Sequence, residues 1–238
     1  MPEMFRLWVY LSTTPLLWLT ATLVAYVVAD RISLLLHRHP LANPVLIAVI
    51  LLVLVLRGTG TEFSRYFEGA QFVHFMLGPA TVALAVPLIA QGRQVKRLIV
   101  PIAAALIAGS VTAIVTAIGL AWALGASPQT VASLAPKSVT TPIAMGIAEA
   151  IGGIPTLTAV LVILTGIIGA MSVTPLMNAL GVTDYAARGF AAGVASHGIG
   201  TARAFQVSEI AGTFAGLGMA LNGLLTAILA PMLMALWR

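Results

Sequence analysis

The sequence contains no cysteine and very little charge. Of its 238 residues, none is cysteine and only 8% are Asp, Glu, Lys or Arg. The lack of cysteine excludes disulfides, thiolate metal sites and cysteine nucleophiles. A soluble domain usually carries about 25% charged residues, so this chain cannot cover a water-facing surface of ordinary size. Because 60% of the residues are hydrophobic, we expect lipid to cover most of the outside.

The few charges have a basic excess, with a formal net charge of +5. They lie in short stretches between apolar runs, and no basic stripe is present that could follow a phosphate backbone. We therefore expect no nucleic-acid partner. Basic loops of this kind are typical of the cytoplasmic side of membrane proteins, which predicts a multi-pass protein of the inner (cytoplasmic) membrane.

The apolar runs predict an all-α fold, a polytopic transmembrane helix bundle. A helix that spans the hydrocarbon core needs about 20 apolar residues. By that measure the chain has about eight segments (seven to nine are compatible), at 15–36, 42–56, 70–91, 98–124, 129–150, 155–180, 185–205 and 208–237. We interpret residues 1–238 as one transmembrane domain, with 15–124 and 129–237 as candidate halves. The first run is too long for a cleaved signal and is expected to be retained.

The basic loops predict an orientation. If every segment crosses once, the basic residues of loops 31–39 and 93–97 lie on the same side. The positive-inside rule then places both loops in the cytoplasm and both chain ends outside. A single re-entrant segment would reverse the C-terminal part. The sequence leaves open whether segments 42–56, 129–150 and 185–205 cross or re-enter.

Three segments contain residues that interrupt helices. The interrupting residues are Gly78-Pro79, the stretch 136–142 with a proline at each end, and the glycine-rich stretch 197–201. Proline removes a backbone donor, and in a membrane the freed backbone groups need partners in protein, water or ligand. We therefore predict helices broken near the bilayer middle and lining a cavity. The five residues 78–82 can be laid over 198–202, as in an internal repeat, although five small residues also match by chance.

The stretch at Lys137 is the first candidate site. Charged groups inside a membrane are costly, and Lys137 stands beside Ser138, Thr140 and Thr141. A helix that begins here would direct unpaired N–H groups and a positive dipole end at the break. With the ammonium and the hydroxyls, these groups would form a carboxylate site. The alternative is that Lys137 lies at the interface and extends outward to water.

The stretch at His197 is the second candidate site. Gly198 and Gly200 would let a ligand approach the backbone, and histidine titrates near neutral pH, so His197 could carry a coupling proton. Arg203 offers a fork of donors suited to a carboxylate. The alternatives are a histidine bonded to a neighbouring helix and an arginine that merely flanks the segment end.

Glu149 is the other candidate for proton coupling, and its alternative role is to mark the end of its segment. The full set of predicted substrate-binding residues is Gly78, Pro79, Thr81, Lys137, Ser138, Thr140, Thr141, His197, Gly198, Gly200, Thr201 and Arg203. No HExxH, P-loop or dinucleotide motif is present. We therefore predict no catalytic residue, no metal and no cofactor, and a protein that is not an enzyme.

The interrupted stretches resemble those of the LrgB/CidB family of bacterial membrane proteins. The resemblance rests on residues 77–88, 136–144 and 195–204, supported by 43–44, 152–153 and 165–166. It implies one of two functions. One is a holin-like or antiholin-like protein that modulates murein hydrolase activity and autolysis, often with an LrgA/CidA-like partner. The other is small-carboxylate transport, as in a related plastid glycolate/glycerate translocator.

The charged residues favour transport over a simple pore. A holin-like pore needs helices that oligomerise, but it does not need cations grouped with broken helices. We therefore expect proton-coupled, alternating-access transport of a small carboxylate of the glycolate, glycerate or pyruvate class. The antiholin-like function is the alternative. A homodimer is compatible with the sequence, but no residue predicts one.

Overall fold

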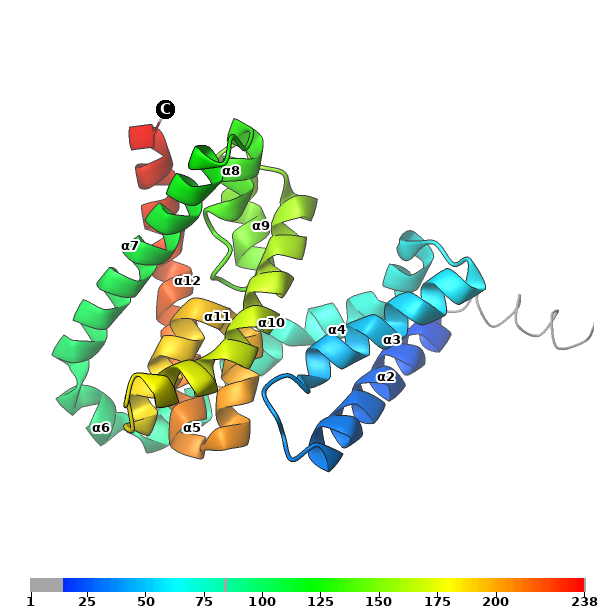
Figure 1. Ribbon diagram of the computed structural model, residues 1–238, viewed down its shortest axis with the longest axis horizontal. Helices are drawn as coiled ribbons and strands as arrows, with labels where there is room; N and C mark the ends of the chain where they lie inside the picture. Colours follow the sequence, from blue (N-terminus) through cyan, green and yellow to red (C-terminus); the bar gives the residue numbers. More distant parts are fainter. Residues whose placement is uncertain (1–14, 84, 238) are drawn as a thin grey trace, which may run out of the picture. The chain divides into compact units, whose positions relative to one another are not determined.

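The computed structural model describes residues 15–83 and 85–237, which are almost entirely helical and include no strand. The helices are α2 (Pro15–Leu35), α3 (Pro44–Thr59), α4 (Phe63–Ala83), α5 (Ala85–Ala90), α6 (Gly92–Arg97), α7 (Ile99–Ala123), α8 (Pro128–Leu134), α9 (Thr141–Ala150), α10 (Pro155–Ala179), α11 (Tyr185–Val207) and α12 (Glu209–Trp237) (Figure 1). The chain divides into two compact units at residues 83 and 84, which are described separately.

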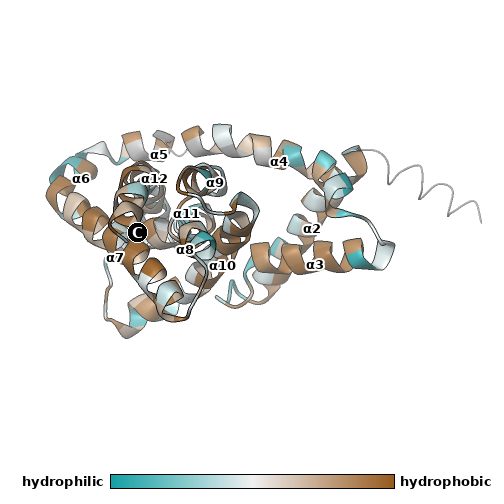
Figure 2. Ribbon diagram, turned by 90° about the horizontal axis from the view of Figure 1, so that it is seen from above, coloured by the Kyte–Doolittle hydropathy of each residue, from teal (hydrophilic) through white to brown (hydrophobic). Residues whose placement is uncertain are grey.

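The predicted helical membrane protein is confirmed. Four helices among the described residues are long and apolar enough to cross a membrane, namely α2, α7, α10 and α12. Figure 2 shows α7 as hydrophobic along most of its length, whereas the short α6 that precedes it is hydrophilic. The basic residues of α6 therefore lie next to the start of an apolar helix.

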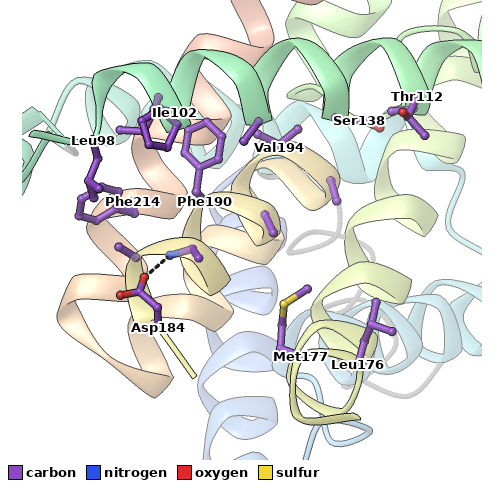
Figure 3. Close-up of a pocket in the computed structure, with 18 of the residues that line it drawn as sticks. Leu98, Ile102, Thr112, Ser138, Leu176, Met177, Asp184, Phe190, Val194 and Phe214 are labelled. Carbon is purple, nitrogen blue, oxygen red and sulfur yellow. Dashed lines mark hydrogen bonds between the residues drawn. The ribbon is translucent and has the colours of Figure 1, made fainter. Parts of the chain in front are cut away.

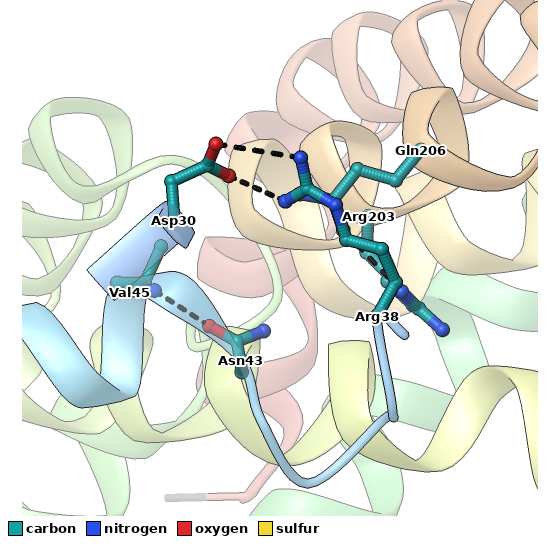
Figure 4. A network of polar contacts seen from close by, with 6 residues as sticks. All are labelled: Asp30, Arg38, Asn43, Val45, Arg203 and Gln206. Carbon is teal, nitrogen blue, oxygen red and sulfur yellow. Dashed lines mark hydrogen bonds and ion pairs between the residues drawn. The ribbon is translucent and has the colours of Figure 1, made fainter. Parts of the chain in front are cut away.

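The first unit consists of α2, α3 and α4, and α2 packs against both of the others. Its α2–α3 loop is held by polar contacts (Figure 4). Arg38 forms an ion pair with Asp30, and Asn43 caps α3 by accepting a hydrogen bond from the Val45 N–H at 2.9 Å. This cap satisfies a donor that a helix start otherwise leaves free.

The predicted break at Gly78-Pro79 is wrong. Helix α4 continues through both residues to Ala83, with Pro79 inside it. Proline costs a helix one backbone hydrogen bond, and in an apolar environment continuing the helix still pairs more backbone groups than opening it would. Predicted segment 70–91 therefore comprises the end of α4 and the short α5.

The second unit contains a first helical hairpin, made of α8 and α9 and joined by a tip at residues 135–140. In Figure 1 the chain enters α8 and leaves α9 at the same end of the unit, where α7 ends and α10 begins. The last turn of α8 is tied to the start of α10 through Ser133, whose hydroxyl accepts a hydrogen bond from the Ile154 N–H at 2.8 Å. The predicted segment 129–150 thus turns back instead of running straight through.

Helix α11 forms a second hairpin, because its backbone leaves helical geometry at Ser196 and His197. Its two arms lie against each other: a Cβ on Gly200 would stand 2.6 Å from the Ala192 carbonyl oxygen. In Figure 1 both ends of α11 lie at the opposite end of the unit from the base of the first hairpin. The predicted break at 197–201 is therefore present, and it reverses the chain.

Helix α12 runs beside both arms of the second hairpin and continues past its tip to the first. Gly193 of the first arm packs on the α12 backbone, where an added Cβ would lie 1.9 Å from the Ala215 carbonyl oxygen. Further along, Ala230 and Met234 of α12 join the apolar core that contains Val139 of the first tip. After the short helices α5 and α6, the second unit thus has three long helices around two hairpins that enter from opposite ends.

Candidate functional site

The two hairpin tips meet at one buried side chain, Asn222 of α12. Its exposure is 1%. The Asn222 amide nitrogen donates to the Ser138 carbonyl of the first tip at 3.3 Å and to the Val194 carbonyl, just before the second tip, at 3.0 Å. An asparagine amide has two donors and two acceptor positions, so both of its donors are used to hold the tips.

The amide oxygen of Asn222 ties the same junction to two of the long helices. It accepts hydrogen bonds from Ser110 of α7 at 2.6 Å and from Thr226 of α12 at 3.2 Å. All four hydrogen-bonding positions of the amide are therefore occupied in a site without exposed polar atoms. A fully satisfied buried network of this kind specifies one arrangement of its members.

Helix α10 provides the seat for the second tip. The His197 Nε2 lies 2.9 Å from the Val162 carbonyl oxygen, and Val162 itself belongs to the core around the first tip. Gly166 leaves room for the imidazole, since an added Cβ would lie 2.6 Å from the ring. Gly169 leaves room in the same way for the Ser196 hydroxyl. The glycines of α10 therefore determine how closely this tip approaches.

His197 also has an uncommon backbone conformation, with φ at +42°. Residues other than glycine rarely adopt positive φ, and such positions cluster at functional sites and cost about 1–3 kcal/mol. The side chain is 4% exposed, and Thr201 donates to the His197 carbonyl at 2.9 Å. The chain thus turns sharply at a histidine that is fixed on both its ring and its backbone.

Lys137 and Ser138 line a cavity of about 820 Å³ between α7, the end of α10 and the first arm of α11. Figure 3 shows Ser138 and Thr112 together at one end of it, with Ile102, Phe190 and Phe214 further along. Lys137 is half-buried, and no carboxylate of the described residues forms an ion pair with it. The cavity is therefore apolar along most of its wall and positively charged at the first tip.

The remaining predicted residues of the two tips lie where the sequence placed them, although they differ in exposure. Thr140 and Thr141 begin α9 and are half-buried. Thr201 and Gly200 are buried in the second arm, and Gly198 is half-buried beside His197. The structure thus brings the 136–141 and 197–201 stretches to one junction. Their role in binding a substrate stays a prediction.

Arg203 lies away from the junction. It is buried in the second arm of α11 at 9% exposure, about two turns below the break, and its guanidinium donates to Gln206 at 3.3 Å (Figure 4). Beside it lie Ala192 and Gly189 of the first arm. It is therefore not a segment flank, and it does not share the cavity of Lys137.

Glu149 does not have the burial on which its proton-carrier role was based. It is exposed in the last turn of α9, at the base of the first hairpin. This position agrees with the alternative, that it marks the end of its segment. Gly78 and Pro79 belong to the other unit and are exposed on α4, and the Thr81 side chain lies outside the described part of the structure.

Asn222 and its partners Ser110 and Thr226 are not among the residues predicted from the sequence. A signal was present, because Asn222 is the one amide side chain within the apolar run 208–237. Polar residues in membrane helices usually bond across helices. A neutral amide is a weaker signal in a sequence than a charged residue, because its transfer into a membrane costs less free energy.

These features define a class: a helical membrane protein with two oppositely directed hairpins whose tips share a buried polar junction. The chain belongs to the LrgB-like family, whose profile matches residues 22–236. The predicted family resemblance is therefore confirmed. No solved structure matches this chain.

Curated relatives cover nearly the whole chain. The holin-like protein CidB of Staphylococcus epidermidis is 31% identical over 221 residues, 93% of this chain and 96% of the relative. The protein YwbG of Bacillus subtilis is 34% identical over 216 residues, 90% of this chain and 95% of the relative. The antiholin-like protein LrgB of Bacillus mycoides is 31% identical over 227 residues, 94% of this chain and 97% of the relative.

Proposed function

We propose that this protein transports small carboxylates by alternating access. The observation that carries the proposal is the junction of two oppositely directed hairpins beside a cavity lined by Lys137. Interrupted helices inside a membrane protein are tolerated where they line a cavity. In secondary transporters, such interruptions form the substrate site near the bilayer middle.

The charge of Lys137 selects the class of substrate. An ammonium in an apolar wall is costly, and no carboxylate of the described residues offsets its charge. An anionic ligand would do so while it is bound. The Ser138 and Thr112 hydroxyls stand in the same cavity and supply further donors. Lys137 would therefore hold the carboxylate of a substrate.

The coupling proton is assigned to His197. Its Nε2 faces a backbone carbonyl, so this nitrogen carries the hydrogen and Nδ1 is left to take up a proton. Protonation would change the charge at the second tip without breaking the bond to α10. The hairpin could then change its packing in step with the proton.

A second candidate function is suggested by the names of the relatives. Curated relatives are named holin-like CidB and antiholin-like LrgB. A role in modulating murein hydrolase activity and autolysis, with an LrgA/CidA-like membrane partner, is the corresponding function for this chain. Transport is compatible with it, since a change in metabolite or proton balance would itself alter autolysis.

The deciding experiment is uptake of labelled glycolate, glycerate and pyruvate into proteoliposomes, with and without a pH gradient. We expect uptake of at least one, stimulated by an inward proton gradient. Lys137→Ala should lower uptake about 10- to 100-fold, because it removes a charge-assisted contact worth about 1.5–3 kcal/mol. Lys96→Ala is the matched control, since Lys96 is an exposed lysine of α6, and should transport normally.

The alternative has its own readout. Release of a large trapped dye without uptake of any of the three acids would favour a pore over a transporter. Unchanged uptake in both Lys137→Ala and His197→Ala would show that the substrate binds elsewhere. Autolysis of cells that express the transport-inactive Lys137→Ala protein would test whether the two activities can be separated.

A further inference from the structure

The cavity beside Lys137 is larger and more apolar than a two- or three-carbon acid requires. Its volume of about 820 Å³ falls in the range of pockets that enclose drug-sized ligands, about 300–1,000 Å³. Its wall beyond the tip is formed by large side chains, among them Ile102, Phe190 and Phe214. A small hydroxy acid would leave most of this space without contacts.

The polar groups of the cavity are concentrated at its two ends. Lys137, Ser138 and Thr112 line it at the first tip, and Asp184 lines it near the start of α11. The Asp184 carboxylate accepts a hydrogen bond from the Ala187 N–H at 2.7 Å (Figure 3). The first arm of α11 separates Asp184 from the tip by about 15 Å. The end at Lys137 therefore attracts an anion, while the end at Asp184 repels one.

From this asymmetry we infer that the preferred ligand is a water-soluble monocarboxylate with an apolar body of about four to six carbons. Its carboxylate lies at Lys137, and its hydrocarbon chain extends along Val194 toward Phe190. The inference rests on the proposed transport function and specifies its substrate. A polyhydroxylated acid is disfavoured, because its hydroxyls would be buried against a wall with few hydrogen-bond partners.

The test is binding of acetate, butanoate, hexanoate and glycerate to the purified full-length protein, by titration calorimetry. Each buried methylene is worth about fourfold in affinity, so hexanoate should bind roughly 60-fold more tightly than acetate if about three of its four additional methylenes are fully buried. Hexanol lacks the charge and should bind poorly. Lys137→Gln should weaken all four acids and leave hexanol unchanged.

A pair of variants tests where the hydrocarbon chain of the ligand lies. Ala105→Phe fills the cavity wall and should remove the advantage of hexanoate while keeping acetate binding. Ala103→Phe, an equally exposed position of α7 that does not line the cavity, should bind like the parent protein. If Ala105→Phe binds hexanoate normally, the chain lies elsewhere and the inference is wrong.

The outcomes separate this inference from the proposed function. Uptake of a small carboxylate together with equal binding of acetate, butanoate and hexanoate would overturn the inference alone. Absence of both binding and uptake for every acid would overturn both. Affinity that continues to rise to hexadecanoate and is unchanged in Lys137→Gln would show that a lipid chain occupies the groove, which also overturns the inference.

Discussion

The two hairpins of the second unit both turn the chain back inside the protein, but the residues at their tips differ. The tip of the first is a six-residue loop, 135–140, which contains Lys137 and Ser138 at a cavity. The tip of the second is a two-residue break at Ser196 and His197, both buried. The first hairpin is anchored by Ser133 in the last turn of α8, and the second by glycines that bring backbones together. The first tip is thus open to a cavity, as the proposed transport function requires, whereas the second is packed against its neighbours.

The largest effect should come from a substitution that prevents the close packing of the second hairpin on α12. Gly193→Ala would put a Cβ 1.9 Å from the Ala215 carbonyl oxygen, so the helices must separate. We expect a loss of about 3 kcal/mol in the free energy of unfolding, measured by denaturation in mixed micelles. In the first hairpin, Gly146→Ala meets nothing within 4 Å and should stabilise its helix slightly. An equal loss of unfolding free energy in both variants would contradict this difference between the hairpins.

The next effect concerns the side chain that both tips share. Asn222→Asp keeps the shape and the acceptor toward Ser110 but replaces both N–H donors by an acceptor that faces two carbonyls. We expect a loss of about 2 kcal/mol in the free energy of unfolding and a fall in carboxylate uptake of at least about tenfold, because one tip has lost its register with the other. Asn178→Asp, at an exposed position, is the matched control. Uptake unchanged by Asn222→Asp would mean that the tips act independently.

The smallest effect compares two buried serines, one from each hairpin. The Ser133 hydroxyl donates to the Gln129 carbonyl at 2.7 Å and accepts from the Ile154 N–H, so Ser133→Ala should cost about 1.5 kcal/mol of unfolding free energy. The Ser196 hydroxyl has no partner among the described residues. Ser196→Ala should therefore change stability by less than about 0.5 kcal/mol. A large loss at Ser196 would reveal a ligand or water that binds there.

The two breaks at the hairpin tips were predictable because residues with strong local preferences lie at or beside them. Prolines at both ends of 136–142 disfavour a continuous helix, and glycines weaken the helix next to His197, although the non-helical residues themselves are Ser196 and His197. The same reasoning failed at Gly78-Pro79, where one proline is accommodated inside α4. A break requires competing partners for the freed backbone groups, and those partners come from other helices that a local pattern does not reveal.

The reversal of the chain in both hairpins was left open for a related reason. A run of about 20 apolar residues has the same composition whether it crosses the membrane or turns halfway. The contacts that decide between these two are between distant residues, such as Ala192 with Gly200 and Ser133 with Ile154. Asn222 was missed because three of its four hydrogen-bond partners come from α7, the first tip and α11, and only Thr226 lies near it in the sequence.

The two hairpins affect how the membrane topology of this protein can be determined by experiment. In the second unit, five apolar runs would give five membrane crossings if each run crossed once. Three long helices and two hairpins that turn back give three crossings. Both numbers are odd, so a reporter fused to the C-terminus gives the same side for either arrangement. Labels in the connections 125–127 and 152–154 separate the two arrangements, because these connections flank the first hairpin and share a side only if the chain turns back between them.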